Sequence, residues 1–319
     1  MTLAISVTGL RKSFGDTLVL DGIDLAVPEG SVFSLLGPNG AGKTTTVQIL
    51  STLLPADAGR IEVAGHDLAT AAARIRAAIG VTGQFSAIDP LLTGAENLRL
   101  MAELNHLPRP QRAARVTGLL EQFGLTEAAR RPASTYSGGM QRRLDLAMTL
   151  TGNPRLIFLD EPTTGLDPRS RRDMWQHIRG LVAGGVTIFL TTQYLDEADE
   201  LADQIAVLDH GRIVAAGRAA ELKRQIPGGH VQLQFATAAG LDTAAGLLGG
   251  ATRDDDALTL RVAGGDDAGS VRALLNRLHD AGADADRVSV HSPSLDDVFF
   301  AFTGTGPSGP QPTEEVATR

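Results

Sequence analysis

One segment of the sequence has the residue types and spacing that bind phosphate. The segment GPNGAGKT, residues 37–44, matches the pattern G-x-x-x-x-G-K-[ST]. Its glycines allow backbone N–H groups to turn inward around phosphate oxygens. Lys43 supplies a positive charge to the β- and γ-phosphates, and Thr44 offers a hydroxyl to Mg²⁺. The candidate ATP-binding residues here are Gly37, Pro38, Asn39, Gly40, Ala41, Gly42, Lys43, Thr44 and Thr45.

The neighbours of this loop distinguish it from a glycine-rich turn with a chance lysine. The apolar run SVFSLL precedes it and predicts a strand, and a helical pattern follows it. The N-terminus of that helix would add its dipole to the phosphate site. By itself the loop establishes nucleotide binding and no more.

A pair of carboxylates follows a second apolar run. In LIFLDEP, residues 156–162, four apolar residues predict a buried strand with Asp160 at its carboxyl end. A solvated turn is the usual explanation of such a pair. With a phosphate loop upstream, we instead expect Asp160 to hold Mg²⁺, directly or through water. Glu161 would then act as general base on a water in line with the γ-phosphate.

The elements that must position these residues alternate between strand and helix. Strands are predicted at residues 31–36, 60–63, 156–159, 187–190 and 204–208, with helical patterns between them. This alternation predicts a mixed α/β core. Strand patterns stop between about residues 86 and 150, which predicts an inserted helical subdomain.

A second domain is predicted after the break IPGGH at residues 226–230. The pattern that follows reads β-α-β-β-α-β, with a hairpin around three aspartates, and predicts a small α+β domain of ferredoxin-like fold. The expected boundaries are 1–226 for the first domain and 227–302 for the second. Residues 303–319 are rich in Gly, Pro and Thr and are expected to be disordered.

Composition excludes several classes of function. The 319 residues carry a formal net charge of -8, which argues against a general nucleic-acid binder. Cysteine is absent, which removes disulfides and thiolate chemistry. The sequence contains no apolar run of 18 residues and no signal-peptide core, so we expect a chain that neither spans a membrane nor is secreted.

The segment YSGGMQRRLDLAM, residues 136–148, indicates the family. It resembles the signature loop of ATP-binding cassette (ABC) proteins, here Ser137, Gly138, Gly139, Met140 and Gln141. A Ser-Gly-Gly turn alone is weak evidence. The ordered set is specific: GPNGAGKT, Gln84 in VTGQFSAI, SGGMQ, LDEP, GLD at residues 165–167, and a polar residue at 193. The resemblance covers at least residues 3–220.

The resemblance implies a P-loop cassette with a RecA-like core, an antiparallel β subdomain and the helical insertion. Two cassettes would pair head to tail, so that Ser137–Gly139 of one caps ATP on the other. Asp167 would lie at the dimer interface. Gln84 would sense the γ-phosphate and Mg²⁺, and Phe14 would stack on adenine unless it is a core aromatic.

Gln193, in TTQYLDEADELAD, stands where ABC ATPases usually have histidine. Its amide can donate to phosphate and accept from water, but it cannot carry a proton or a positive charge. The site is therefore either degenerate or a subgroup variant with slow hydrolysis. Glu161, Gln193 and Lys43 remain the candidate catalytic residues. The acidic stretch DEADE is expected to form a solvated helix face.

The segments TTQYLDEADELAD, VTGQ and SLDDVFFAFTG resemble the bacterial daunorubicin/doxorubicin-resistance ATPases. The resemblance implies a homodimer that hydrolyses MgATP on the cytoplasmic face of the membrane. It also implies a separate membrane permease for a hydrophobic drug, a lipid or a secondary metabolite. Alternatives are an ABC ATPase of ribosome or DNA-repair type and a regulatory switch with negligible turnover.

The segment SLDDVFFAF predicts one more helix. Leu295, Val298, Phe299 and Phe302 follow at i, i+3, i+4 and i+7, and Ser294 with Asp297 resembles a capping box. The apolar stripe would pack on the small domain or hold two C-terminal domains together across a dimer. In either case we expect Phe299 to be buried.

Overall fold

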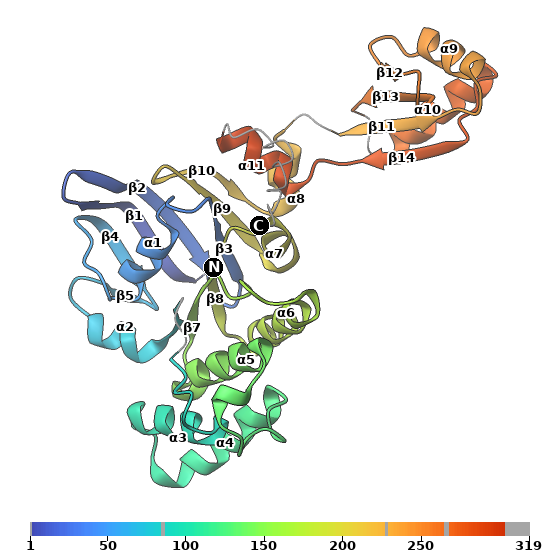
Figure 1. The fold of residues 1–319 in the computed structure, drawn as a ribbon. Coiled ribbons are helices and arrows are strands. Elements are labelled where there is room, and N and C mark those ends of the chain that lie inside the picture. The colour runs from blue at the N-terminus through green and yellow to red at the C-terminus, as the bar shows by residue number, and fades with distance from the viewer. Residues whose placement is uncertain (1, 84–86, 227–228, 265–267, 304–319) are drawn as a thin grey trace, which may run out of the picture. The chain divides into compact units, whose positions relative to one another are not determined.

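The computed structural model describes residues 2–83, 87–226, 229–264 and 268–303 (Figure 1). The chain divides into two compact units, Met1–Ala219 and Ala220–Arg319. The sequence predicts the boundary seven residues later, after residue 226. Helix α8 (Ala219–Arg224) lies between these two positions, and all of it except Ala219 falls in the second unit. The predicted disordered tail lies outside the described residues, apart from Thr303.

The first unit is built on a six-stranded sheet. Strands β6, β7, β8, β3 and β9 are parallel neighbours, and β10 pairs with β9 in the antiparallel sense. The order is β10 (Arg212–Gly217), β9 (Gln204–Asp209), β3 (Val32–Leu36), β8 (Thr187–Thr192), β7 (Leu156–Asp160) and β6 (Ile79–Thr82). The sequence pattern predicts β3, β7, β8 and β9 but not β6 or β10. Strand β6 is only four residues long and contains Gly80, a poor strand former.

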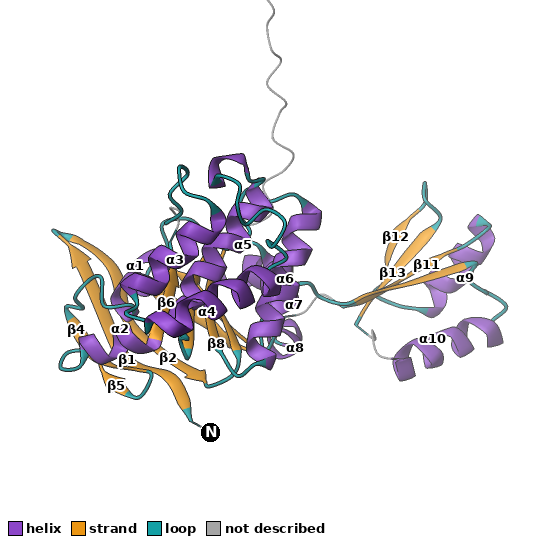
Figure 2. Ribbon diagram, turned by 90° about the horizontal axis from the view of Figure 1, so that it is seen from below, coloured by secondary structure: helices purple, strands orange, loops and turns teal. Residues whose placement is uncertain are grey.

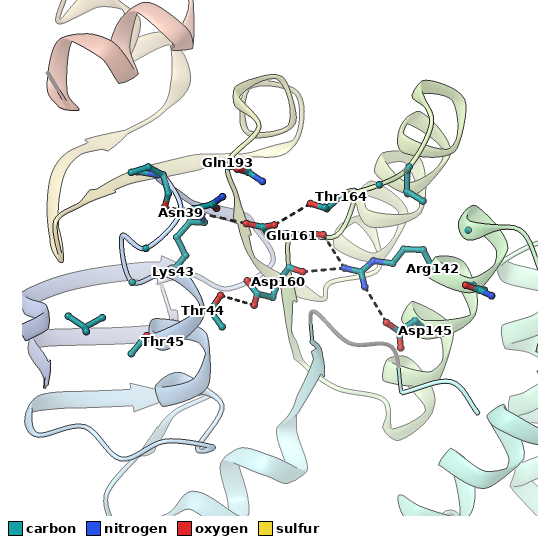
Figure 3. Close-up of a pocket in the computed structure, with 18 residues that line it drawn as sticks. Asn39, Lys43, Thr44, Thr45, Arg142, Asp145, Asp160, Glu161, Thr164 and Gln193 are labelled. Carbon is teal, nitrogen blue, oxygen red and sulfur yellow. Dashed lines mark hydrogen bonds and ion pairs between the residues drawn. The ribbon is translucent and has the colours of Figure 1, made fainter. Parts of the chain in front are cut away.

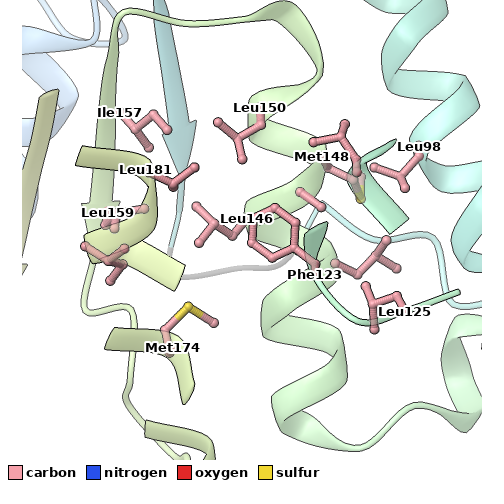
Figure 4. Packing of buried hydrophobic residues seen from close by; sticks show 14 of the residues in the cluster. Leu98, Phe123, Leu125, Leu146, Met148, Leu150, Ile157, Leu159, Met174 and Leu181 are labelled. Carbon is pink, nitrogen blue, oxygen red and sulfur yellow. The ribbon is translucent and has the colours of Figure 1, made fainter. Parts of the chain in front are cut away.

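Helices cover both faces of this sheet, so its central strands are buried throughout. On β7, Ile157 and Leu159 point into a core that includes residues of the helical subdomain (Figure 4). Leu156 and Phe158 alternate with them and point into a second core on the opposite face. Helices α5 (Gly138–Thr149) and α6 (Pro168–Ala183) contribute to the first core, and α1 (Lys43–Leu50) contributes to the second.

A second sheet in this unit is antiparallel, as the resemblance implied. Its strands follow the order β2 (Thr17–Pro28), β1 (Leu3–Phe14), β4 (Ala58–Val63) and β5 (His66–Asp67). Its apolar side chains share the second core with α1. The remaining helices outside the insertion are α2 (Ala72–Ala78) and α7 (Leu195–Leu201).

The predicted helical insertion is present. It contains α3 (Gly94–Leu104), α4 (Arg109–Gln122) and α5, with 3₁₀ turns at Ala133–Thr135 and Leu150–Gly152. Thr93 and Glu96 form a capping box that starts α3, with their side chains bonded to each other's backbone N–H. Phe123 and Leu146 join the insertion to the sheet core, which fixes α5 against the strands.

The second unit has the predicted β-α-β-β-α-β order. Its elements are β11 (His230–Gln234), α9 (Ala238–Leu247), β12 (Thr252–Asp254), β13 (Thr259–Ala263), α10 (Ala268–Asp280) and β14 (Arg287–His291). The strands form an antiparallel sheet in the order β12-β13-β11-β14. Figure 1 labels all four strands, and Figure 2 labels β12, β13 and β11 from another side. Val231 and Leu233 of β11 share a core with residues of α9 and α10, so the helices cover one face of this sheet.

Helix α11 (Leu295–Thr303) is also present, and its capping box is confirmed. Ser294 and Asp297 bond each other's backbone N–H, at 3.2 Å and 2.8 Å. The burial differs from the expectation. Leu295 and Val298 are buried, whereas Phe299 is only half-buried.

Candidate functional site

Three neighbouring parallel strands bring the predicted site residues to one edge of the sheet. Strand β3 ends at Leu36, directly before the phosphate loop, and β7 ends at Asp160. Strand β8 lies between them, and its last residue, Thr192, is in register with Leu36. The carboxyl ends of parallel strands are where α/β proteins bind ligands, so this edge is the expected place for chemistry.

The geometry of the phosphate loop requires its glycines. A Cβ at position 37 would lie 2.3 Å from the carbonyl oxygen of Leu208. Gly42 has φ of 109°, and a Cβ there would lie 2.5 Å from Leu20 Cδ2. Larger residues at either position would displace the loop from the strands, so the sequence pattern has a steric cause here.

Lys43 is the buried cation of the site. Its Nζ donates to the carbonyls of Gly37 at 2.7 Å and Pro38 at 3.1 Å, and lies 3.7 Å from Glu161 Oε1. Burial lowers the pKa of the Lys43 ammonium, while the charges of Glu161 and Asp160 oppose that effect. A cation held mostly by neutral carbonyls can turn to an incoming phosphate.

Asp160 and Thr44 are placed to share a hard cation. The Thr44 hydroxyl donates to Asp160 Oδ2 at 3.1 Å, although the two residues are 116 positions apart in sequence. Thr191 of β8 donates its hydroxyl to Asp160 Oδ1. A carboxylate and a hydroxyl are ligands that Mg²⁺ accepts together with substrate phosphates, so the predicted pair fits that metal.

Glu161 lies between Lys43 and Thr164, as Figure 3 shows. Its Oε2 accepts from the Thr164 hydroxyl at 3.3 Å, and its side chain is 16% exposed. Its backbone has φ of 49°, in the left-handed region that non-glycine residues rarely adopt. Such a conformation persists only where the surroundings fix it, and it often marks a functional position.

Gln193 follows β8 and lines the same cavity as Lys43 and Glu161. The acidic stretch after it departs from the prediction of a solvated face. Asp196, Asp199 and Glu200 are exposed, but Glu197 is fully buried. Trp175 donates its indole N–H to Glu197 at 3.3 Å. Burial raises the pKa of this carboxyl, and the bond from Trp175 opposes that effect. The prediction was wrong at Glu197 because α7 turns this position toward α6.

The signature residues begin a helix, as predicted. Ser137 is the N-cap of α5, and its hydroxyl accepts from the N–H of Met140 at 3.3 Å. Asp167 caps α6 in the same way, with Oδ1 2.9 Å from the N–H groups of Arg169 and Ser170. Hydrogen bonds from Ser170 hold the pKa of the Asp167 carboxyl below its usual range. Both residues therefore have a local capping role, and their contacts across a dimer stay predictions.

The structure does not place Phe14 at this site, and it does not describe Gln84. Phe14 ends β1 with 49% of its surface exposed, next to Lys12, whose Nζ lies 5.5 Å from the ring centroid. It is therefore not the core aromatic of the alternative reading, and its stacking on adenine stays a prediction. Gln84 lies outside the described residues.

Most of the remaining candidates line one cavity of about 810 Å³. The candidates that do not line it are Gly37, Ala41, Ser137, Gly139, Met140 and Asp167. Its walls come from the phosphate loop, the ends of β7 and β8, and the start of α5. The lining residues named by the sequence analysis are Pro38, Asn39, Gly40, Gly42, Lys43, Thr44, Thr45, Gly138, Gln141, Asp160, Glu161 and Gln193. The volume is in the range of small-molecule sites.

Sequence reasoning missed several residues that hold this site together. Thr191 bonds Asp160, and its carbonyl accepts from the N–H of Glu161 at 3.1 Å. The carbonyl of Thr192 accepts from the N–H of Gly37 at 3.3 Å. The threonine pair directly before Gln193 was the available signal, since it ends a strand that must neighbour LIFLD. Arg142 and Asp145 also line the cavity, and the motif SGGMQRRLD gave no indication of their contacts.

Comparison with known proteins agrees with this geometry. Residues 20–164 match the family model described as ABC transporter. The chain is 48% identical to the daunorubicin resistance ATP-binding protein DrrA3 of Streptomyces coeruleorubidus, over 94% of this chain and 96% of the relative. It is 46% identical to the daunorubicin/doxorubicin resistance ATP-binding protein DrrA of Streptomyces peucetius, over 99% and 97%. The Nod factor export ATP-binding protein I of Ralstonia nicotianae is 43% identical, over 69% of each chain.

Solved structures support the same assignment. The structure of an ATP-binding subunit of an ABC transporter covers 70% of this chain and 93% of its own, with a TM-score of 0.63 and 28% identity. An ATP-binding cassette in its ADP conformation covers 69% and 93%, also with a TM-score of 0.63. In the part of the chain that the structure describes, no helix has the length and apolar character needed to cross a bilayer. The chain belongs to the ABC transporter family, among its daunorubicin/doxorubicin-resistance ATP-binding proteins.

Proposed function

We propose that this chain binds and hydrolyses MgATP as a homodimer on the cytoplasmic face of the membrane. It thereby drives export of a hydrophobic drug through a separate permease. The observation that carries the proposal is the meeting of Lys43, Thr44, Asp160 and Glu161 at the ends of adjacent strands. This set combines a phosphate cation, two oxygen ligands for Mg²⁺ and a carboxylate base. Phosphoryl transfer to water requires those groups.

Each residue has a distinct part in the proposed reaction. Lys43 leaves the carbonyls of Gly37 and Pro38 to bind the β- and γ-phosphates. Glu161 accepts the proton of the attacking water, and Gln193 orients that water with its amide. Thr44 and Asp160 would hold Mg²⁺, which would supply charge neutralisation at the phosphate oxygens.

The family resemblance and the exposure of the signature residues support the proposed homodimer. The phosphate loop and the signature helix of the same chain border one cavity, but family resemblance places Ser137 and Gly138 against the ATP of the partner. Gly138 and Ser137 are both exposed, so they are accessible to a second copy. Asp167, which caps the adjacent helix α6, would lie at the same interface.

The second unit favours drug export over Nod factor export. The drug-resistance relatives match 94% or more of this chain, so their similarity includes the second unit. The similarity to the Nod factor export protein covers only 69%, about the length of the first unit. The chain is therefore related over its full length to the drug-resistance group.

Transport measurements with the permease test this proposal. Inverted membrane vesicles that contain the chain and its permease should accumulate daunorubicin when MgATP is added. Vesicles with the Lys43→Ala variant should not. Accumulation that persists with Lys43→Ala, or that needs no ATP, contradicts the proposal.

A regulatory switch with negligible turnover is the alternative. It would bind MgATP but release little phosphate, with or without the permease. We expect turnover by the purified chain and faster turnover when the permease is present in proteoliposomes. Turnover near zero in both preparations favours the switch.

A further inference from the structure

Arg142 is a partly buried arginine whose hydrogen bonds converge on the backbone around the proposed base. It lies on α5, five residues after Ser137, and its side chain is 18% exposed. Its Nε donates to the carbonyl of Pro162 at 2.8 Å, and its Nη2 donates to the carbonyls of Asp160 and Glu161, each at 3.2 Å. Three successive carbonyls at the end of β7 are thus held by one guanidinium.

These contacts fix the unusual conformation of Glu161. Its φ of 49° places the backbone in the left-handed region, which a glutamate does not adopt without support. The N–H of Glu161 is held from β8, by the carbonyl of Thr191 at 3.1 Å. Its carbonyl is held by Arg142 from α5. The peptide groups on both sides of the residue are therefore restrained, and the direction of the carboxylate follows from them.

Asp145 holds Arg142 from the next turn of α5. Its Oδ2 accepts from Arg142 Nη1 at 3.3 Å, and only 5% of its side chain is exposed. Its Oδ1 accepts from the N–H of Ala87 at 3.4 Å. Ala87 is three residues after Gln84, so Asp145 connects the signature helix with the segment that carries the proposed γ-phosphate sensor. Burial raises the pKa of Asp145, and the charge of Arg142 opposes this effect.

We propose that Arg142, anchored by Asp145, is a positioning residue that sets the orientation of Glu161 and connects it to the helical subdomain. The inference rests on the proposed role of Glu161 as general base. A shift of α5 toward or away from the sheet moves the guanidinium with it. Such a shift would change the position of the base without any change in the phosphate loop.

The chemistry of the side chain suggests the variant to use. An arginine presents five donors in a planar fork, whereas lysine has a single ammonium that cannot reach three carbonyls and a carboxylate in that arrangement. Arg142→Lys therefore keeps the charge and loses the fork. Arg143→Lys is the matched control, because Arg143 donates to the carbonyl of Phe123 at 3.0 Å, within the helical subdomain.

Steady-state kinetics of the full chain test the inference. We expect Arg142→Lys to lower kcat by up to about 100-fold, the loss that a misplacement of about 1 Å can cause, with little change in KM for ATP. Arg143→Lys should keep the wild-type kcat. Arg142→Lys with a wild-type kcat, or with an effect on KM alone, overturns the inference.

A double variant separates positioning from loss of structure. Glu161→Gln removes the base, so adding Arg142→Lys should lower the residual rate no further. The double variant should still form an ATP-bound dimer in sedimentation. A further fall in the rate, or loss of the dimer, would mean that Arg142 supports the fold in general. If Glu161→Gln itself leaves kcat unchanged, the proposed base has failed, and that outcome is separate from failure of the arginine.

Asp145→Asn provides a second route if Arg142→Lys does not fold. The asparagine keeps an acceptor for the N–H of Ala87 and loses the charge that anchors the guanidinium. We expect a smaller fall in kcat than for Arg142→Lys, again without a change in KM. An unchanged kcat in this variant, with its fold verified by circular dichroism, contradicts the anchoring role of Asp145.

Discussion

The two units of the chain bury their sheets in different ways. In the first unit, every residue of β3, β7 and β8 is buried, since helices cover both faces of the parallel sheet. In the second unit, β11 alternates between buried and less buried residues, because α9 and α10 cover a single face. The polar face of that sheet carries His230, Gln232 and Gln234.

This difference explains where polar chemistry can be placed. A sheet buried on both faces leaves only its strand ends for charged residues, and the parallel order puts those ends together. Lys43, Asp160 and Glu161 meet there for that reason. The antiparallel sheet of the second unit directs its strand ends to opposite edges, so it has no equivalent edge. We therefore expect catalysis to respond to changes in the first unit and stability to respond in both.

The largest effect expected in the first unit is the loss of ATP affinity in Lys43→Ala. Removing one member of a buried, hydrogen-bonded charge pair costs about 2–5 kcal/mol of binding free energy. Isothermal titration with MgATP would measure it. Arg60→Ala, an exposed residue on β4, is a suitable control. Wild-type affinity in Lys43→Ala would remove the lysine from the site.

Helix α11 offers the corresponding change in the second unit. Leu295→Ala should cost about 2–5 kcal/mol of unfolding free energy, because Leu295 is buried. Phe299→Ala should cost less, since Phe299 is half-buried. Denaturant titration, followed through the unfolding transition of the second unit, measures the loss of unfolding free energy in both variants. Neither variant should alter kcat if the helix packs locally.

The kcat of Leu295→Ala tests the comparison between a catalytic first unit and a structural second unit. A fall in kcat together with loss of the ATP-driven dimer in Leu295→Ala would assign α11 to the dimer interface. The division between a catalytic first unit and a structural second unit would then be wrong.

A smaller kinetic effect is expected at Gln193. Its amide can place water but cannot carry charge, so Gln193→Ala should lower kcat by about 10- to 100-fold, about 1.4–2.7 kcal/mol, the scale of one polar transition-state contact. Phosphate release under saturating MgATP measures this. Gln193→His is the informative companion, and we expect it to raise kcat. An alanine variant with wild-type kcat means that Gln193 has no part in the chemistry.

The smallest effect concerns Glu197 and pH. Its pKa in the folded chain is raised by burial above the ordinary value of 4.5, so the native state binds more protons than the unfolded chain between those two values. The stability contribution of Glu197 is therefore present at low pH and is lost as pH rises through the raised pKa. Glu197→Gln keeps one acceptor oxygen for the Trp175 N–H and removes the titration.

The carboxyl of Glu197 titrates at about pH 4.5 in the unfolded chain. As pH rises from that value, we expect the unfolding free energy of Glu197→Gln to increase relative to that of the wild type. Urea unfolding at a series of pH values measures the difference. Glu121→Gln, an exposed position on α4, is the control. A constant difference across the series contradicts the raised pKa.

Much of the site could be predicted from the sequence because most of its residues lie in two short segments, each contiguous in the chain. The segments GPNGAGKT and LDEP each follow an apolar strand, so their position at the sheet edge could be inferred. The bonds of Thr191 and Arg142 could not, since they depend on which strands and helices are neighbours. Glu197 was mistaken for a surface residue because its acidic neighbours are exposed and only the helix orientation buries it.

The fold was predictable to a similar degree. Long apolar strands and the β-α-β-β-α-β order of the second unit were visible as patterns. The short strand β6 was not, because glycine weakens its pattern. The burial of Phe299 was overestimated, because a helical stripe of four apolar residues does not say how much of it is covered.

Dimer formation by Glu161→Gln is the most direct test of the central claim, that Glu161 is the base of an ATPase that works as a dimer. The variant should bind MgATP, release almost no phosphate and sediment as a dimer with ATP retained. The wild type should return to monomer as it hydrolyses ATP, and Lys43→Ala should stay monomeric throughout. A Glu161→Gln protein that hydrolyses ATP at the wild-type rate and remains a monomer would contradict the account.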